Sequence, residues 1–243
     1  MDKISFKTAD GTVEAFLFKT KTDSASPLVI LYMDAFGPRA SLFEVAERLN
    51  AIGLSVVIPN LYYRFGDYAP FDPKTAFVEP GERGRVMGMI QSLKIESVIS
   101  DTRKLLAALS NEPGLDLSRI GVLGYCMGGK FALAAASYFP ELVKAAASIH
   151  GGGLVTDQED SPHKNVSAIK GKVYVGIAVN DRSFTEEQHA VLERAFEESL
   201  VASRMEVYEG ALHGFAIRDM GTYNEEASEI HYSRITDLFS STL

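Results

Sequence analysis

The stretch Ile120-Gly-Val-Leu-Gly-Tyr-Cys126-Met-Gly-Gly-Lys130 indicates the fold of this 243-residue chain. An apolar, strand-like run leads through the pattern G-x-C-x-G into a segment rich in alanine, as in the nucleophile elbow between a strand and a helix. Gly124 and Gly128 flank Cys126 where the strained turn and the closely packed helix leave no room for a side chain. The turn would also place Cys126 at a helix N-terminus, whose free N–H groups and dipole stabilise a thiolate.

Short apolar runs rich in Val and Ile recur along the chain, as in strands buried on both faces of a parallel sheet. Asp10-Gly11 lies between two alternating segments and predicts an opening antiparallel hairpin. The hairpin strands are Ile4–Thr8 and Val13–Phe18, and the later strands are Leu28–Met33, Leu54–Ile58, Ile120–Leu123, Ala145–Ile149, Val173–Val179 and Met205–Tyr208.

Segments with helical spacing lie between these strands. They cover Leu42–Leu49, Ile95–Leu109, Leu192–Phe196 and Glu225–Phe239, the last with Ile230, Ile235, Leu238 and Phe239 on one face. The alternation predicts one α/β domain over residues 1–243, in which a mainly parallel central sheet begins with the antiparallel hairpin and has helices on both faces. Ligands of such sheets bind at the carboxyl ends of the strands.

Local signals predict the ends of two helices. Ser41 and Glu44 form a capping-box pattern at the start of the first helix, and Gly53 is its expected stop. Thr185 and Gln188 form the same pattern before a later helix.

Two long stretches show no clear period. They are Tyr62–Gly88 and Gly151–Lys172. Loops of this length in a compact domain are more often lids or binding loops than simple connections, so we expect them near the ligand site.

Composition and charge limit the classes of function. Lys and Arg number 24 against 32 Asp and Glu, giving a net charge of −8 without any Lys/Arg-rich run, so a nucleic-acid surface or polybasic membrane anchor is not expected. The charged start MDKISFKTADG differs from a secretory signal, and no apolar run approaches the ~18 residues of a membrane span. The single cysteine excludes an internal disulfide and a multi-cysteine zinc site. We therefore expect a cytoplasmic protein, while its oligomeric state is left open.

A nucleophile on such an elbow needs a base, and the base needs an acid to orient it, both on loops at the same edge of the sheet. His213 follows a predicted strand and precedes a loop, whereas His189 and His231 fall within helical patterns and are predicted to be surface residues. Asp181 also follows a predicted strand. The chain order Cys126, Asp181, His213 is the nucleophile, acid, base order of the α/β-hydrolase fold.

On these residues, the chain resembles the dienelactone hydrolase family, which comprises cysteine members of the α/β-hydrolase fold. The resemblance extends over nearly the whole chain. Besides the elbow, it rests on Asp34-Ala-Phe-Gly37, Pro59-Asn-Leu-Tyr-Tyr-Arg64, Asn180-Asp-Arg-Ser-Phe184 and His213-Gly-Phe215, which follow one another in family order. It implies hydrolysis of a small ester or lactone, of the carboxymethylenebutenolidase type, through an acyl-enzyme and without a cofactor or metal.

The resemblance also implies roles for individual residues. Cys126 would be the nucleophile, His213 the base and Asp181 the orienting acid. Backbone N–H groups of Ala35 and Met127 would hold the oxyanion that forms on acyl attack. Substrate contacts are expected from Asp34, Phe36, Tyr63, Arg64, Arg83, Arg85, His150 and Arg218.

Two positions depart from the family pattern. Family enzymes that act on dienelactone usually have a glutamate at the position of Asp34, where it is thought to partner the proton of the cysteine. They also carry an arginine four residues after the catalytic histidine, which binds the substrate carboxylate. Here that position is Ile217, with Arg218 one residue further on. Arg83 or Arg85 would supply the family's other carboxylate contact.

Other patterns give alternative interpretations. Gly124–Lys130 fits seven positions of the phosphate-binding motif G-x-x-x-x-G-K-[ST], but the eighth residue is Phe131, which has no hydroxyl for magnesium. His150-Gly-Gly-Gly153 resembles an oxyanion motif of lipases but follows the nucleophile, so we expect it to line the pocket. A non-catalytic ligand-binding or redox-sensing protein that uses Cys126 as an exposed thiol is the alternative from a different class.

Overall fold

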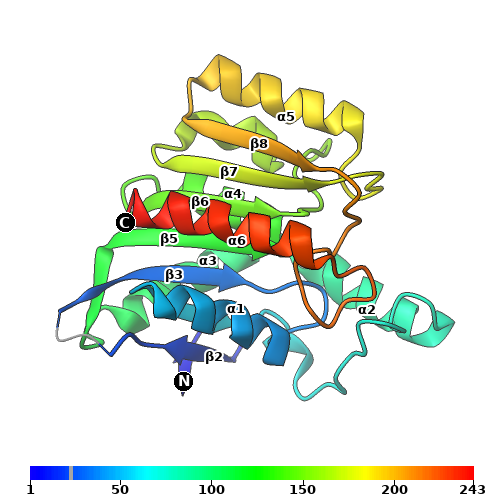
Figure 1. The fold of residues 1–243 in the computed structure, drawn as a ribbon. Coiled ribbons are helices and arrows are strands. Elements are labelled where there is room, and N and C mark those ends of the chain that lie inside the picture. Colours follow the sequence, from blue (N-terminus) through cyan, green and yellow to red (C-terminus); the bar gives the residue numbers. More distant parts are fainter. Residues whose placement is uncertain (22–23) are drawn as a thin grey trace.

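The fold is built on a mixed β-sheet, seen in a computed structural model that describes residues 1–21 and 24–243. Its eight strands lie in the order β1-β2-β4-β3-β5-β6-β7-β8 (Figure 1). They are β1 (Asp2–Lys7), β2 (Thr12–Phe18), β3 (Ser26–Tyr32), β4 (Ser55–Pro59), β5 (Leu115–Tyr125), β6 (Val143–Ile149), β7 (Lys172–Ala178) and β8 (Ser203–Tyr208). β1 pairs with β2 and β2 with β4 in antiparallel fashion, while the other neighbours are parallel. The predicted fold class is confirmed.

Burial along the strands follows their place in the sheet. Every residue of β3 and β4 is buried, because helices cover both faces of the central strands. In β2, buried positions alternate with partly exposed ones, since only one face of the opening hairpin packs on the core. The continuous apolar runs and the alternating segments of the sequence therefore predicted two different environments correctly.

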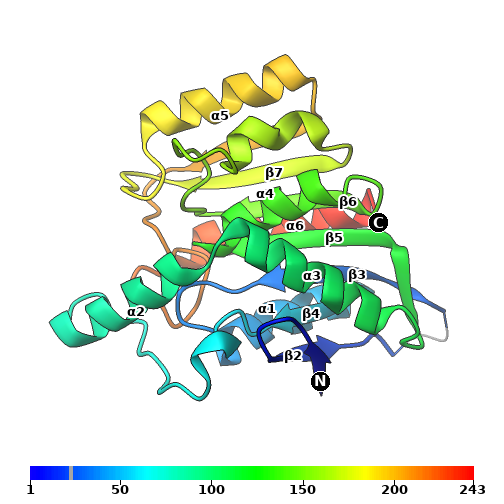
Figure 2. The ribbon, with the colours of Figure 1, turned by 180° about the vertical axis from the view of Figure 1, so that it is seen from behind.

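Helices cover the two faces of the sheet. α1 (Ala40–Ala51) and α6 (Glu225–Ser240) lie on the face that is in front in Figure 1. α3 (Ile95–Leu109) and α4 (Gly128–Tyr138) lie on the opposite face, in front in Figure 2. α5 (Glu186–Ser199) packs beside the short helix η2 (Pro162–Ala168) near the β8 edge. η1 (Tyr63–Phe65) and α2 (Pro80–Ser92) follow β4, and α2 projects beyond the carboxyl ends of the strands.

Two predicted helix ends are confirmed. Thr185 and Gln188 form a reciprocal capping box before α5. Gly53, with a φ of 90°, follows the cap of α1 and takes the left-handed conformation that ends a helix.

The capping box predicted from Ser41 and Glu44 is wrong. α1 begins at Ala40 with Arg39 as its cap, so Ser41 lies inside the first turn. Arg39 is fixed by ion pairs with Asp34, five residues before it, and with Asp219 on the distant loop after β8. A tertiary contact, which the local pattern does not contain, therefore sets the start of this helix.

The two long stretches contain more regular structure than predicted. η1 and the first part of α2 lie within Tyr62–Gly88, and η2 lies within Gly151–Lys172. α2 escaped the sequence pattern because Gly81, Gly84 and Gly88 interrupt it and only Val86 and Met89 are buried. No helix in the described part of the chain combines the length and apolar character needed to cross a membrane.

The buried face of α6 agrees with the prediction at Ile235 and Phe239 and differs from it at two other positions. His231, predicted to be a surface residue, is fully buried, and its Nε2 lies 3.0 Å from the hydroxyl of Tyr125. Ile230, predicted to face the core, is exposed. The buried hydrogen bond to Tyr125 thus compensates for the burial of the polar His231 ring against the sheet. Hydrophobic spacing alone does not predict such a buried polar residue.

Candidate active site

Cys126 occupies a sharp turn between β5 and α4. Its φ is 53°, in the left-handed region, which costs a residue with a side chain roughly 1–2 kcal/mol. A Cβ atom on Gly124 would lie 2.0 Å from the carbonyl oxygen of Gly128, and one on Gly128 would lie 2.3 Å from that of Tyr32. Both glycines are therefore required by close backbone approach, as the elbow pattern predicts.

His213 and Asp181 meet at the same edge of the sheet. Asp181 follows β7 and His213 follows β8, and Nδ1 of the histidine lies 2.7 Å from Oδ2 of the aspartate. Asp181 is buried and also accepts the backbone N–H of Ser183 at 2.7 Å. Burial raises the pKa of the Asp181 carboxyl, but its bond to His213 and the N–H of Ser183 outweigh burial and lower it. The carboxylate is thus held ionised beside the ring.

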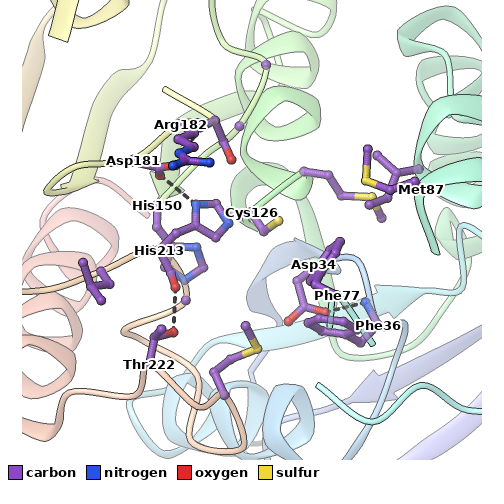
Figure 3. A pocket seen from close by; sticks show the side chains of 18 of the residues that line it. Asp34, Phe36, Phe77, Met87, Cys126, His150, Asp181, Arg182, His213 and Thr222 are labelled. Atoms are coloured by element: carbon purple, nitrogen blue, oxygen red, sulfur yellow. Dashed lines mark hydrogen bonds and ion pairs between the residues drawn. The ribbon is translucent and has the colours of Figure 1, made fainter. Parts of the chain in front are cut away.

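Cys126 lies beside the His213 imidazole in the same pocket (Figure 3). Burial lowers the pKa of His213, but the Cys126 thiolate and the Asp181 carboxylate raise it, with a net result of about 10. The histidine is therefore favoured as an imidazolium whenever the thiol is ionised. The three residues predicted from the sequence as a group therefore line one pocket.

The pocket around them has a volume of about 780 Å³. Met87 of α2 lies across it from Asp181 and His213 (Figure 3). The other apolar lining residues are Phe36, Phe77, Ile90, Met127, Leu212 and Met220. Phe36 was predicted as a substrate contact. Phe77 and Met87 were not, although both fall in the stretch expected to be a lid or a binding loop. The space suits a small organic molecule with an apolar body.

Three basic side chains also line this pocket, namely Arg83, Lys130 and Arg182. None of them has a carboxylate partner within the residues that the structure describes. Burial lowers the pKa of Lys130. Arg83 was predicted as a substrate contact, while Lys130 and Arg182 were not. The sequence does not show whether a basic side chain next to a motif points into the pocket or toward solvent. Together the three residues bring basic groups to a pocket whose two acidic side chains, Asp34 and Asp181, are already paired.

His150 forms part of the same wall at the end of β6. Its ring centroid is 5.0 Å from that of His213 and 5.4 Å from that of Phe215. It is buried, and neither ring nitrogen has a hydrogen-bond partner among residues 1–21 and 24–243. Burial holds its pKa well below the usual range, so the ring is neutral. His150 therefore lines the pocket as predicted, and its two ring nitrogens have no hydrogen-bond partner in these residues.

Of the two predicted oxyanion donors, Met127 lines the pocket, whereas Ala35 is fully buried between the lining residues Asp34 and Phe36. Ala35 follows β3, and its carbonyl accepts the hydroxyl of Tyr62 at 3.0 Å. Met127 is the cap residue of α4. Within the described chain, neither backbone N–H donates to another group. Both N–H groups are therefore unengaged in these residues, and their oxyanion role stays a prediction.

Asp34 lines the pocket but does not contact the cysteine as the family glutamate would. Its Oδ1 and Oδ2 accept hydrogen bonds from Arg39 at 2.7 and 2.9 Å. Oδ1 also accepts the N–H of Phe36 at 3.0 Å. The shorter side chain is thus fully engaged by its own loop and by Arg39.

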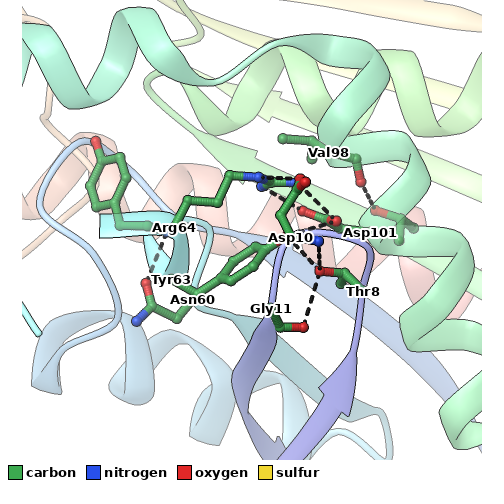
Figure 4. Close-up of polar contacts among 10 residues, drawn as sticks. Thr8, Asp10, Gly11, Asn60, Tyr63, Arg64, Val98 and Asp101 are labelled. Carbon is green, nitrogen blue, oxygen red and sulfur yellow. Dashed lines mark hydrogen bonds and ion pairs between the residues drawn. The ribbon is translucent and has the colours of Figure 1, made fainter. Parts of the chain in front are cut away.

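Tyr63 and Arg64, predicted as substrate contacts, lie outside the pocket. Arg64 donates two hydrogen bonds to the buried carboxylate of Asp101, at 2.8 and 3.1 Å, and pairs with Asp10 (Figure 4). The hydroxyl of Tyr63 bonds to Asp101 and to Thr8. These contacts tie the β1–β2 turn to α3, because Asp101 needs compensation for its burial.

Arg85 and Arg218 are the other two predicted contacts that the structure corrects. Arg85 donates to Glu82 and to the carbonyl of Ala69. Arg218 pairs with Glu44 at 2.9 Å and is 60% exposed. Both side chains are held by these partners and do not line the pocket.

The phosphate-loop interpretation gains no support from the geometry. Phe131, at the position of the phosphate-loop hydroxyl, is fully buried against Tyr32 with ring centroids 6.2 Å apart. No group of three or more His, Cys, Asp or Glu side chains in the described residues is placed to hold a metal ion.

Comparison with known proteins agrees with this architecture. The dienelactone hydrolase family matches residues 13–243. A carboxymethylenebutenolidase from Pseudomonas sp. strain P51 is 26% identical over 212 residues, which are 87% of this chain and 83% of that protein. Carboxymethylenebutenolidase 1 from Cupriavidus pinatubonensis is 27% identical over 232 residues, or 95% and 92% of the two chains.

Solved structures show the same fold. One from Klebsiella pneumoniae superposes with a TM-score of 0.85 at 20% identity and covers 98% of this chain and 97% of its own. A dienelactone hydrolase from Anabaena variabilis gives 0.69 at 17% identity, with 100% and 97% covered. The chain belongs to the dienelactone hydrolase family, a family of hydrolases with the α/β-hydrolase fold.

Proposed function

We propose that the protein hydrolyses a small ester or lactone through a Cys126–His213–Asp181 triad. One observation carries the proposal: a thiol on a strained turn, an imidazole and a buried carboxylate, distant in sequence, line one pocket, with the carboxylate 2.7 Å from the ring. Membership of the hydrolase family and the names of the relatives support the same reaction class.

Acylation begins with the thiolate–imidazolium pair. The sulfur of Cys126 attacks the carbonyl carbon, and the electron pair of the C=O bond moves to its oxygen. The N–H groups of Ala35 and Met127 stabilise this oxyanion. When the carbonyl re-forms, the C–O bond of the ester breaks, and the leaving oxygen takes the proton from His213.

Deacylation uses the same groups in reverse. Neutral His213 removes a proton from water, whose oxygen attacks the thioester carbon on Cys126. The second oxyanion collapses with cleavage of the C–S bond, which releases the acid product and regenerates the thiolate. Asp181 holds the ring in the required orientation and stabilises its charged form in both steps.

The pocket supports a particular class of substrate. Its apolar lining accommodates a small hydrocarbon body, and the basic groups Arg83, Lys130 and Arg182 favour a substrate that carries a carboxylate. Both ring nitrogens of His150 are buried and have no partner in the described residues, so a rotation of the ring toward the pocket would offer an N–H or a ring nitrogen to a substrate oxygen or hydroxyl. These three basic residues take the place of the family arginine, whose position is occupied by Ile217 in this chain.

The test is a panel of lactones, aryl esters and thioesters, each with and without a carboxylate, offered to the wild type and Cys126→Ala. We expect hydrolysis by the wild type, at least ~10³-fold slower hydrolysis by Cys126→Ala, and a lower KM for the carboxylate-bearing members. Arg182→Gln should raise KM for those members only. Equal turnover by Cys126→Ala would refute the proposed function.

A further inference from the structure

We propose that Arg39 is a positioning residue that holds the oxyanion-binding loop in register with the loop of the catalytic histidine. The proposal rests on the proposed function and adds a residue that the triad does not include. Arg39 lies at the start of α1, and its guanidinium reaches two acidic side chains on different loops.

One partner is Asp34, on the loop after β3. Nη1 and Nη2 of Arg39 donate to its two carboxylate oxygens at 2.7 and 2.9 Å. The other partner is Asp219, on the loop after β8, which receives Nε and Nη2 at 2.7 and 2.9 Å. The planar fork of arginine binds two carboxylates at once in this way, and no other side chain has that donor geometry.

The Asp34 side of the link fixes the backbone that offers the Ala35 N–H. Oδ1 of Asp34 accepts the N–H of Phe36 at 3.0 Å, which holds the Ala35–Phe36 peptide. The carbonyl of Asp34 accepts the N–H of Gly37 at 3.5 Å, which holds the Asp34–Ala35 peptide that carries the Ala35 N–H. The Ala35 carbonyl is held from outside by Tyr62. A change in the Asp34 side chain therefore rotates the oxyanion donor.

The Asp219 side constrains the segment that begins at His213. The hydroxyl of Thr222 donates to the carbonyl of His213 at 2.6 Å, and the N–H of Met220 donates to the carbonyl of Ile217 at 3.0 Å. Asp219 lies in this turn. Arg39 thus couples the position of the base to that of the oxyanion donor across the pocket.

The charge of Arg39 is stable in this position. Its side chain is 15% exposed, and that of Asp34 is 3% exposed. Burial lowers the pKa of Arg39, but the carboxylates of Asp34 and Asp219 raise it above its ordinary value. His213 is also held by Asp181, independently of Arg39. Loss of Arg39 should therefore disturb the oxyanion site more than the thiolate–imidazolium pair.

Two reactions of Cys126 separate these effects. Acylation by an aryl ester needs the oxyanion donors, whereas alkylation by iodoacetamide needs only the thiolate. We expect Arg39→Met to lower the acylation rate about 10- to 100-fold and to change the alkylation rate by less than about 3-fold. Arg39→Lys should recover only part of the loss, because an ammonium group cannot bind both carboxylates bidentately.

Arg48→Met is the matched control. Arg48 lies on the same helix and binds Glu229 bidentately at 2.6 and 2.7 Å, away from the pocket. It should leave both rates unchanged. Asp219→Asn keeps the buried Arg39–Asp34 pair and weakens only the link to the loop after β8, so this variant replaces Arg39→Met if the latter does not fold. We expect it to lower the acylation rate about 3- to 10-fold.

Equal losses in the two reactions, or Asp219→Asn rates equal to those of the wild type, would overturn the role of Arg39 and leave the proposed function intact. A wild type that iodoacetamide alkylates but no ester acylates would instead refute the proposed function, and the role of Arg39 with it.

Discussion

Nδ1 of His213 lies 2.7 Å from Oδ2 of Asp181, although the two residues are 32 positions apart in the sequence. The contact exists because β7 and β8 are parallel neighbours, so the loops that follow them leave the sheet at the same edge. Asp181 is buried and cannot exchange this partner for water without cost. The bond therefore fixes the ring that we propose acts as the base for Cys126.

Asp181→Asn should leave the fold intact and lower kcat by ~10²–10⁴, because the amide no longer stabilises the imidazolium or selects the correct tautomer. KM should change little. Steady-state kinetics and the melting temperature check both statements. Asp116→Asn is the control, since Asp116 pairs with Arg119 at the start of β5, away from the pocket. A kcat within about 3-fold of the wild type would contradict the orienting role of Asp181.

The raised pKa of His213 predicts how stability depends on pH. From 6.5 the pKa rises to about 10 in the folded protein, so the folded state binds this proton more tightly than the unfolded chain. The contribution is complete below pH 6.5 and is lost as the pH rises toward 10. Urea unfolding of the wild type and His213→Gln should differ by ~1–3 kcal/mol at pH 6 and converge by pH 10. A difference that stays constant over this range would refute the ion pair.

His150→Phe should raise stability and lower activity. The phenyl ring retains the aromatic packing. Removal of two buried nitrogens that have no partner in the part of the chain that the structure describes should add ~1–2 kcal/mol to the free energy of unfolding. The loss of a substrate hydrogen bond should lower kcat/KM about 10-fold. His163→Phe is the control: Nδ1 of His163 is bonded to Ser161, so that variant should lose stability and keep its activity. Unchanged kcat/KM in His150→Phe would exclude His150 from substrate binding.

Gly124→Ala should prevent folding or cost more than ~3 kcal/mol, because its Cβ would meet backbone atoms of the elbow that cannot move away. Gly84→Ala in α2 makes the same chemical change where nothing lies within 4 Å of the new Cβ. It should add ~0.5–1 kcal/mol by lowering the cost of helix formation. Thermal unfolding compares the two, and a stable Gly124→Ala protein would contradict the tight elbow.

The sequence predicts the sheet and the grouping of Cys126, Asp181 and His213 well. Short apolar runs and the glycines around Cys126 reflect local requirements: a strand buried on both faces, and a turn without room for Cβ atoms. Residues placed directly after parallel strands must meet at one edge, whatever their distance in the sequence. These features follow from backbone geometry, which the chain specifies locally.

Long side chains on loops were predicted less well. Tyr63, Arg64, Arg85 and Arg218 all bind groups outside the pocket, because each finds an acidic or carbonyl partner nearby. Arg39 was missed for the same reason, since its two partners come from segments far apart in the sequence. The direction of a long side chain depends on its tertiary partners, and a single sequence does not show which distant residues lie beside it.

The central claim is that Cys126 forms an acyl-enzyme. The most direct measurement is an acid quench of the wild type during turnover of an aryl ester, followed by intact-mass analysis and peptide mapping. We predict one acyl group per chain, located on Cys126, with a burst of the phenol product of matching amplitude. A protein that shows only oxidation of Cys126, or an acyl group on another residue during turnover, would contradict the account.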